Sequence, residues 1–372
     1  MIRFAAATVY LQEALNTGRT MNRVLFEGRF LINMAASVVR QDDLRPIHGK
    51  MDWERMYRIA DYNRIANLIY IGVLGNEKVP QNWRDHFFER YQESLRFGDF
   101  CEEAEKEILT LLDFKEVPAL VLESSSRREL YEMKEMAGEC PLRLYVKPED
   151  YTLVKGYLID LGYETDRVYG SSGERMRRIG GFSVEIYSHF PYRTELYRKK
   201  LRQLFNRARL FFPYKHIYCL TEKDRLSYLF ARAAYYYATD QLLARHLLDL
   251  CILYRSLKEE NMEEMWKWMR ELKISVLSRK LLGLGYMWFG TKEESAAHTE
   301  QKELEIYDVI ESRILGYGKE AREVIPEALA LEGAILKEEE KENRKARRKL
   351  MYQKMKDLCS QMRECMTRIL QR

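Results

Sequence analysis

The chain has 372 residues, of which 46% are hydrophobic and 32% charged, with only 19 Gly and 8 Pro. This is the composition of a globular protein and excludes the disordered and collagen-like classes. The net charge of +5 is concentrated at one end, since residues 337–372 hold 12 Lys/Arg and 6 Asp/Glu whereas residues 1–336 hold 50 and 51. A neutral body argues against an extended nucleic-acid surface. The basic tail could bind RNA weakly or an acidic membrane surface, but packing of the tail helix on the protein itself or on a second copy is the preferred interpretation.

No stretch approaches the roughly 18 apolar residues that a membrane span needs. The N-terminal apolar patch Phe4–Leu11 meets Gln12 and Glu13 too early for a secretion signal. We therefore expect a cytoplasmic protein that does not contact a membrane. Its six cysteines lie far apart without CxxC or CxxH spacing, which favours reduced thiols over disulfides or zinc ligands.

The first third of the chain has helical periodicity. Apolar residues repeat at helical spacing over 21–44, 53–71 and 82–114, which predicts three helices. Met21 is a second candidate start, which would make residues 1–20 an extension. We expect residues 1–114 to form a helical region.

An apolar run changes the pattern at Val117–Leu122 and predicts a buried strand. The S-x-x-E spacing of Ser126 and Glu129 then predicts a capped helix that reaches about Ala137. Strand followed by helix marks the beginning of an α/β unit.

The unit continues with the alternating stretch Leu142–Val146, which predicts a second strand, and with a helix over 148–162 that ends at a glycine. Residues 175–179 and 182–187 flank a Gly-Gly turn and predict a β-hairpin. We expect the mixed sheet to end near His189.

Helical periodicity returns after the sheet. Thr221 and Asp224 predict the start of a long apolar helix that ends near Leu257. These patterns divide the rest of the chain into an α/β domain over 115–192, a helical region over 193–318 and charged tail helices over 319–372.

The tail ends in a short seam of apolar side chains at the 4-3-4-3-4 spacing of a coiled coil. The seam consists of Met351, Met355, Leu358, Met362, Cys365 and Ile369. It predicts a terminal helix that packs on the body of the protein or on a second copy, and therefore a possible homodimer.

Six short pieces of this pattern, in their order and spacing, resemble the uncharacterised nucleotidyltransferase family of the polymerase-β-like superfamily over about residues 20–300. The pieces are Asp52-Trp53-Glu54 before the helix with Ile59-Ala60, the strand-turn-helix Val117–Tyr131, the strand before Lys147–Tyr151, Leu161-Gly162-Tyr163, Val184-Glu185-Ile186, and Leu247–Leu250. The resemblance implies an α+β fold, in which a small mixed-sheet nucleotidyltransferase-like domain lies between mainly helical regions. It also implies transfer of a nucleotide from a nucleoside triphosphate with metal ions.

That chemistry needs three carboxylates, two of which form an Asp-x-Asp pair that binds both metals. The resemblance places Pro141 and Arg143 where these two aspartates should stand, and it places Glu185 at the third carboxylate. The usual Lys-Gly after the first strand is here Glu123-Ser124. Loss of one charged partner typically costs several kcal/mol, so the resemblance implies a degenerate metal site with Glu185 as its retained carboxylate.

Arg143 would repel the metal that the mechanism requires. If their strands are neighbours, strand alternation directs Arg143 and Glu185 to the same face of the sheet. We hypothesise that the two side chains pair and that the guanidinium occupies the vacated metal position. The alternative is a surface salt bridge unrelated to any former site.

Another carboxylate pair at the required i, i+2 spacing is Glu164 and Asp166. This pair follows Gly162 in a predicted loop, which is the wrong place for the metal ligands. It is retained only as a weak alternative.

A phosphate site is conceivable at Ser124, Ser125 and Ser126 with Arg127, because the N-terminus of a helix presents free backbone N–H groups. Helix capping explains the serines equally well. A second candidate anion site is formed by Arg175, Arg177 and Arg178, which are equally typical of the solvated face of a hairpin.

The remaining polar and aromatic candidates favour structural roles. His246, on an apolar helix near Asp249, is interpreted as a structural histidine rather than a base. Tyr235–Tyr237 and the Trp266/Trp268 pair are interpreted as core aromatics rather than stacking surfaces. The sequence contains no H-E-x-x-H, G-x-S-x-G or G-x-x-x-x-G-K motif.

These observations predict a catalytically degenerate member of the family, which acts by binding a nucleotide or a partner protein and needs no cofactor. The alternative is an active enzyme that uses Mg²⁺ to move a nucleoside monophosphate from an NTP to a small-molecule or protein hydroxyl. An antitoxin-like role is a third hypothesis, although the sequence names no partner for it.

Overall fold

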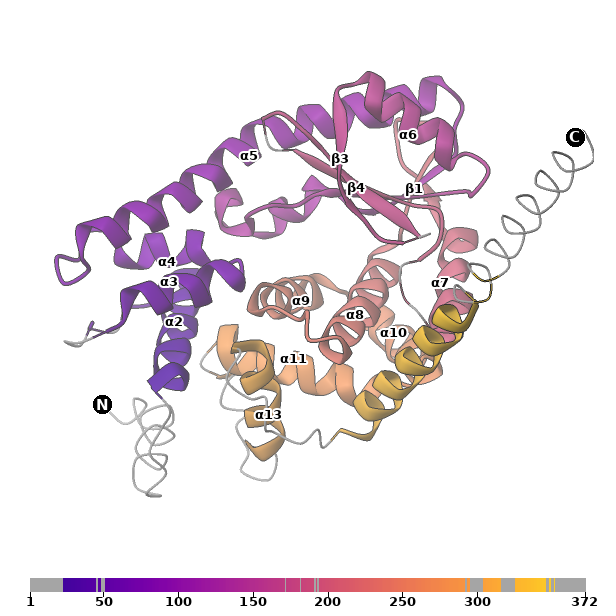
Figure 1. Ribbon diagram of the computed structural model, residues 1–372. Helices are drawn as coiled ribbons and strands as arrows, with labels where there is room; N and C mark the ends of the chain where they lie inside the picture. The colour runs from indigo at the N-terminus through magenta and orange to yellow at the C-terminus, as the bar shows by residue number, and fades with distance from the viewer. Residues whose placement is uncertain are drawn as a thin grey trace, which may run out of the picture.

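A computed structural model describes residues 23–44, 46, 47, 51–170, 172–180, 182–190, 192, 194–291, 293, 294, 304–315, 325–345, 348 and 351. Helices before and after a seven-stranded mixed sheet make this an α+β fold, as expected. In Figure 1, α5 crosses the top of the molecule and α8–α11 form a layer beneath the sheet. The buried apolar side chains of the described residues form one cluster that joins all three parts.

The N-terminal helices are α2 (Arg23–Arg40), α3 (Trp53–Tyr62), α4 (Ala66–Val73) and α5 (Gln81–Phe114). The predicted helices at 21–44 and 82–114 are confirmed as α2 and α5. The 34 residues of α5 give it a length of about 50 Å, so this helix reaches from α3 and α4 to the sheet.

The single helix predicted over 53–71 is wrong, because the chain breaks between α3 and α4. Arg64 has a positive φ of 55° there. The break is held by the beginning of α9 (Ala244–Ser256): the Asn63 side chain accepts a hydrogen bond from the Ala244 N–H at 2.9 Å, and the Arg64 carbonyl accepts one from Arg245 Nε at 2.9 Å. These partners lie about 180 residues away in the sequence, so local periodicity does not reveal them.

The strands are β1 (Ala119–Glu123), β2 (Leu142–Val146), β3 (Tyr163–Val168), β4 (Gly173–Arg178), β5 (Ser183–Tyr187), β6 (Arg209–Leu210) and β7 (Ile217–Cys219). Their order in the sheet is β3-β4-β5-β2-β1-β7-β6. At the centre, β2 pairs antiparallel with β1 and parallel with β5. The predicted strands β1 and β2 and the predicted hairpin of β4 and β5 are confirmed.

Two expectations about the extent of the sheet are wrong. The sheet does not end near His189, because β6 and β7 extend it beyond β1. Strands of two and three residues are too short to show a period. The predicted loop that holds Glu164 and Asp166 is the edge strand β3, of which only Tyr163 is buried.

The capped helix predicted from Ser126 to Ala137 is also wrong. The segment forms two short 3₁₀ helices, η1 (Ser125–Leu130) and η2 (Lys134–Ala137), and no side chain caps η1. In η1, Arg127 and Arg128 are buried. We attribute the tighter turns to these buried side chains, whose contacts outweigh the capping preference. The helix predicted after residue 148 is confirmed as α6 (Tyr151–Asp160), followed by Gly162 at a φ of +83°.

The C-terminal region contains α7 (Glu195–Arg207), α8 (Glu222–Ala238), α9, α10 (Glu259–Glu271), α11 (Ser275–Phe289), α13 (Leu304–Leu315) and a helix over 326–345. Thr221 caps α8 as predicted, since its side chain accepts a hydrogen bond from the Asp224 N–H. The single long helix to Leu257 is wrong, because the chain turns between α8 and α9. Thr239 donates to the Tyr235 carbonyl at 2.9 Å, and Asp240 has a φ of +53°.

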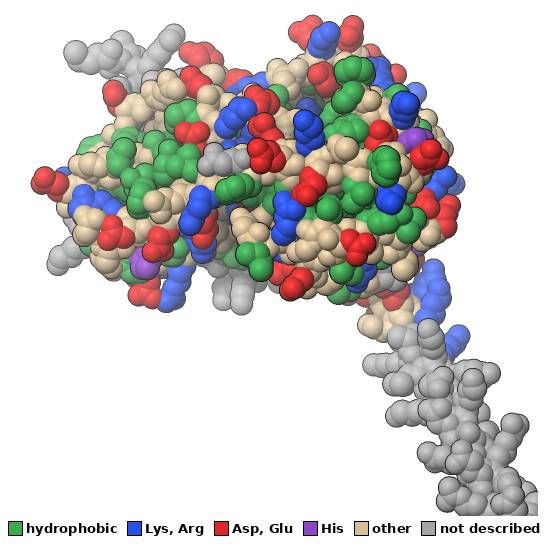
Figure 2. Space-filling model, turned by 90° about the horizontal axis from the view of Figure 1, so that it is seen from above, with side chains coloured by type: hydrophobic (Ala, Val, Ile, Leu, Met, Phe, Trp, Pro, Cys, Tyr) green, Lys and Arg blue, Asp and Glu red, His purple; other side chains and the backbone are tan. Residues whose placement is uncertain are grey.

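The surface of the described protein is mixed in charge. Basic and acidic side chains are interspersed over the face shown in Figure 2, so this face has no extended patch of one sign. Across the described residues, no helix has the length and apolar character needed to span a bilayer. Residues 1–20 and the apolar seam beyond Met351 lie outside the described residues.

Candidate functional site

A cleft of about 670 Å³ lies where the sheet meets the helices on both sides of it in the sequence. Its walls come from the junction of α3 and α4, from α5, from the segment that leads into β2, and from α8 and α9. Eight arginines and four carboxylates line it. The lining therefore carries more positive than negative side chains, which favours an anionic ligand.

Arg143 lies at the centre of this site. Its position on β2 is in register with Glu123 on β1 and with Glu185 on β5. The guanidinium contacts both carboxylates, with Nε 2.5 Å from Glu185 Oε2 and Nη1 2.7 Å from Glu123 Oε2. All three side chains are buried. The predicted Arg143–Glu185 pair is present on one face of the sheet, and its burial excludes the alternative of a surface salt bridge.

Both oxygens of Glu185 have further partners. Tyr187 donates its hydroxyl to Oε2 at 2.6 Å, and Tyr169 donates to Oε1 at 3.2 Å. Burial by itself would raise the pKa of Glu185, but the charge and hydrogen bonds of Arg143 outweigh it and hold this pKa below its usual value. Burial likewise opposes the charge of Arg143, and Glu185 outweighs it to raise the pKa of the arginine. The pair is therefore fully ionised near neutral pH.

Glu123 is shared by three arginines. Besides Arg143 it contacts Arg127 Nη1 at 3.3 Å and forms a close ion pair with Arg232 of α8. The guanidinium of Arg232 also lies over the rings of Tyr228 and Tyr236, at 5.9 and 5.7 Å from their centroids. Burial lowers the pKa of Arg232 from its ordinary value. A single carboxylate therefore holds together three cations that line one cleft.

Asp249 of α9 is a second anchor, which the sequence analysis did not assign to the site. Its Oδ2 lies 3.0 Å from Arg127 Nη1, and its Oδ1 accepts the hydroxyl of Tyr131. Its exposed fraction is only 3%. The one signal in the sequence was a carboxylate within Leu247-Leu248-Asp249-Leu250, because a buried acid on an apolar helix needs a partner.

Arg245, which precedes His246 on α9, is a buried cation whose hydrogen-bond acceptors are neutral. Its three nitrogens donate to the carbonyls of Arg64 and Met136 and to Asn67 Oδ1. Among the described residues it has no carboxylate partner within ion-pair distance. Its positive charge is therefore held in place by neutral acceptors and remains uncompensated within the cleft.

His246 has the structural role that the sequence predicts, although it also lines the cleft. Its Nδ1 accepts the Leu243 N–H at 3.1 Å, and its ring lies 5.1 Å from that of Tyr236. Burial, followed by the charges of Arg232 and the other arginines, holds the pKa of His246 well below its usual value. The neutral imidazole is consistent with its acceptor role at the beginning of α9.

The structure places only one of the four residues of the predicted phosphate site in the cleft. Arg127 lines the cleft, but Ser124, Ser125 and Ser126 are not among the residues that do. The Ser125 N–H donates to Glu105 Oε2 at 2.8 Å, and the hydroxyls of the other two serines bond to each other at 2.7 Å. A backbone group expected to bind phosphate is thus already occupied by a carboxylate.

The hairpin arginines are separated as well. Arg177 lines the cleft. Arg175 pairs with Asp166 on β3 at 2.7 Å, and Arg178 pairs with Glu107 at 2.6 Å. The alternative carboxylate pair, with Glu164, therefore lies on the edge strand, outside the set of residues that line the cleft.

Pro141 and Arg143 both line the cleft, so the two positions expected to hold metal-binding aspartates lie at its surface. Within the described parts of the chain, no group of three or more His, Cys, Asp or Glu side chains is placed to hold a metal ion. Glu123 and Glu185 face each other across a guanidinium, and their oxygens are engaged by arginine and tyrosine. These residues do not fit a divalent cation.

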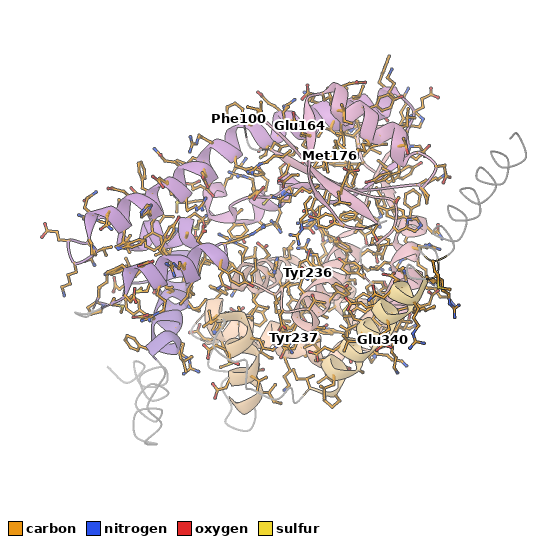
Figure 3. The ribbon with its side chains drawn as sticks, viewed as in Figure 1. Phe100, Glu164, Met176, Tyr236, Tyr237 and Glu340 are labelled. Carbon is orange, nitrogen blue, oxygen red and sulfur yellow. The ribbon has the colours of Figure 1, made fainter. Side chains whose placement is uncertain are left out.

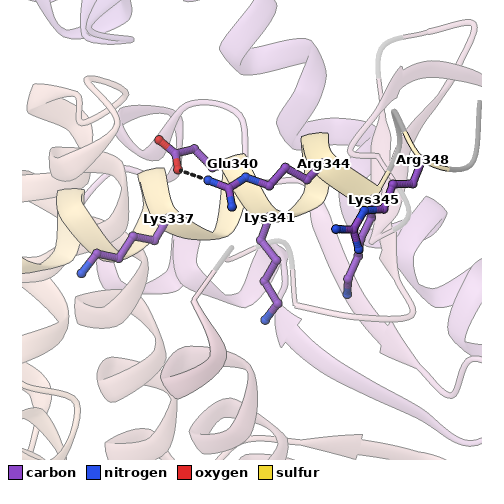
Figure 4. Close-up of a pocket in the computed structure, with 6 residues that line it drawn as sticks. All are labelled: Lys337, Glu340, Lys341, Arg344, Lys345 and Arg348. Atoms are coloured by element: carbon purple, nitrogen blue, oxygen red, sulfur yellow. Dashed lines mark hydrogen bonds and ion pairs between the residues drawn. The ribbon is translucent and has the colours of Figure 1, made fainter. Parts of the chain in front are cut away.

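A second hollow lies on the tail helix, which carries basic side chains on one side (Figure 4). Lys337, Lys341, Arg344, Lys345 and Arg348 line it together with Glu340, which pairs with Arg344. Glu338 and Glu342, on the same helix, pair with Arg198 of α7. The acidic side of the helix thus contacts the body of the protein.

Comparison with known proteins gives one match. A family model described as uncharacterised nucleotidyltransferase matches residues 49–290, about two thirds of the chain. The matched segment contains every element that lines the cleft. Searches of curated proteins and of solved structures find no match.

Proposed function

This chain belongs to the uncharacterised nucleotidyltransferase family, and we propose that it binds a nucleotide in the arginine-lined cleft without transferring it. One observation carries this proposal: Arg143 lies between Glu123 and Glu185 and contacts both. In this proposal the guanidinium of Arg143 takes the place of the metal-binding carboxylates that the resemblance implies.

Energetics support the loss of metal binding. A divalent ion would have to displace the guanidinium of Arg143 from two buried carboxylates. Breaking a buried ion pair by removing one partner typically costs about 3–5 kcal/mol. The ion would then find only two carboxylates, each with competing partners, whereas such ions require several oxygen ligands.

Charge supports an anionic ligand. Inside the cleft, Arg127, Arg143 and Arg232 are balanced by buried carboxylates, while Arg245 adds a charge that is not balanced. Guanidinium groups keep their charge at all physiological pH values and bind phosphate oxygens through paired N–H donors. In this proposal the arginines neutralise the phosphates of the nucleotide, a task that the resemblance assigns to metal ions in an active enzyme.

Calorimetric titration of ATP, GTP, CTP and UTP, with and without Mg²⁺ or Mn²⁺, tests the proposal together with mass spectrometry for transferred nucleotide. We expect binding without added metal and no product. Metal-dependent binding with a nucleotidylated product would overturn it in favour of the active enzyme.

A variant pair locates the binding. Arg232→Gln removes one cleft cation but leaves Glu123 with two arginine partners, so the fold should be retained. We expect it to weaken nucleotide binding about tenfold, as loss of one charge-assisted contact does. Arg90→Gln is the matched control, since Arg90 lines the same cleft but is already paired with Asp61 and Glu93 at 2.7 and 2.8 Å.

A further inference from the structure

The rim of the cleft carries three arginines that have no carboxylate partner within ion-pair distance among the described residues. They are Arg64, Arg96 and Arg177, and all three side chains are exposed. They come from three separate elements, the α3–α4 junction, α5 and β4. Arg90 of α5 differs from them, because two carboxylates neutralise it.

The backbone that presents these side chains is well anchored. The carbonyl of Arg64 accepts a hydrogen bond from the buried Arg245. Phe97 of α5 stacks on Phe182, just before β5, with 5.9 Å between the ring centroids. Arg177 is in register with Ser183 of β5. Three distant segments of the chain therefore hold, around one opening, cations that lack a carboxylate partner among the described residues.

An aromatic ring lies beside these cations. Phe100 lines the cleft and has an exposed fraction of 54%, and Figure 3 locates it on α5, whereas Tyr236 lies on α8 below the sheet. Exposure of a phenyl ring to water is unfavourable, and the ring offers a flat apolar face that a ligand could cover. Stacking on such a ring, together with nearby arginines, is how proteins bind the bases and phosphates of single-stranded nucleotides.

We propose that the rim is a second subsite, and that the ligand is a dinucleotide unit rather than a mononucleotide. This inference rests on the proposed function, in which the 5′-phosphates bind at the buried arginines. The phosphodiester and the second base then lie at the rim, where the unpaired arginines contact the phosphate and Phe100 stacks on the base. A mononucleotide bound at the buried arginines leaves the rim cations without a partner.

The test compares ATP with the dinucleotide pppApA, which carries the same 5′-triphosphate. Calorimetry without added metal should show pppApA binding at least about tenfold more tightly than ATP, the gain expected from one stacked base. Arg96→Gln, Arg177→Gln and Phe100→Ala should each reduce that advantage several-fold and leave ATP binding unchanged. Arg90→Gln should change neither affinity, and thermal unfolding should show that all four variants remain folded.

Equal affinity for ATP and pppApA, or rim variants that weaken both ligands alike, would overturn the subsite. Failure of ATP to bind is a different result, because it contradicts the proposed function. If pppApA then binds and the rim variants weaken it, the subsite stands without that function; if neither ligand binds, both proposals fall.

The same chemistry is found in a free dinucleotide and at the 5′ end of an RNA strand. A 5′-triphosphorylated RNA of ten nucleotides, titrated in parallel, distinguishes these sources. Affinity equal to or higher than that of pppApA identifies a strand end as the ligand. Lower affinity identifies a free dinucleotide as the ligand, because the site then has no room for a strand beyond the second nucleotide.

Discussion

Two arginine–carboxylate pairs join neighbouring strands of the sheet, one at its centre and one near its edge. Arg143 and Glu185 link β2 to β5 with 2.5 Å between their closest atoms, and Arg175 and Asp166 link β4 to β3 at 2.7 Å. The geometry is similar, but the exposed fractions of the carboxylate side chains are 5% and 37%. Water screens the edge pair much more than the central pair, so breaking the same contact should have very different consequences in the two places.

The largest effect is expected from Arg143→Leu. This change leaves Glu185 buried with only tyrosine hydroxyls as hydrogen-bond partners, so the free energy of unfolding should fall by about 3–5 kcal/mol. Urea unfolding followed by circular dichroism measures it. A loss below about 1 kcal/mol would mean that the centre of the sheet is as well solvated as its edge.

A smaller loss is expected when both partners are replaced, in Arg143→Leu/Glu185→Leu. Two apolar side chains leave no unpaired charge at this position, and such replacements of buried ion pairs are often close to neutral. We expect the double variant to be more stable than Arg143→Leu by at least about 2 kcal/mol in the same urea measurement. Additive losses would show that the two side chains do not interact.

The buried His246, which is surrounded by arginines, should make the stability of the protein depend on pH. Its pKa is lowered in the folded protein by burial and by the arginines, so below pH 6.5 the unfolded chain binds a proton that the folded chain does not. Stability should therefore fall as pH decreases, by about 1 kcal/mol between pH 7.5 and pH 5.5 from this group alone.

The measurement is urea unfolding of the wild type and of His246→Gln at both pH values. The variant should lose about 1 kcal/mol less than the wild type on acidification. An identical pH dependence in the two proteins would contradict the assignment of a neutral, buried imidazole.

The smallest effect is expected at the edge, from Asp166→Asn. The pair with Arg175 is partly exposed, and pairs of this kind contribute about 0–1 kcal/mol. Unfolding by urea at low and high salt should show a change below about 1 kcal/mol that salt reduces further. A loss comparable to that of Arg143→Leu would remove the distinction between centre and edge.

Much of the fold was predictable because its signals are local. The 34 residues of α5 show a helical period over many turns, and Thr221 has the residue type and spacing of a helix cap. The pairing of Arg143 with Glu185 was also predictable, since alternation along two adjacent strands determines which side chains share a face.

Other features were not predictable because their causes lie far away in the sequence. The break at Arg64 depends on hydrogen bonds to the beginning of α9. The 3₁₀ turns after Ser124 accompany two buried arginines. The strands β6 and β7 are too short to carry a period, and they extend the sheet through pairing of β7 with β1 and of β6 with β7.

In the candidate site, too, some features follow from the local sequence and others depend on contacts between distant segments. By itself the sequence determined the family resemblance and the order of the elements, because these are properties of residue type and spacing. Only the tertiary structure decided that Arg232, Arg245 and Asp249 reach the same cleft. Helices α8 and α9 are far from β2 along the chain, and it is the packing of these helices beneath the sheet that brings their charges together.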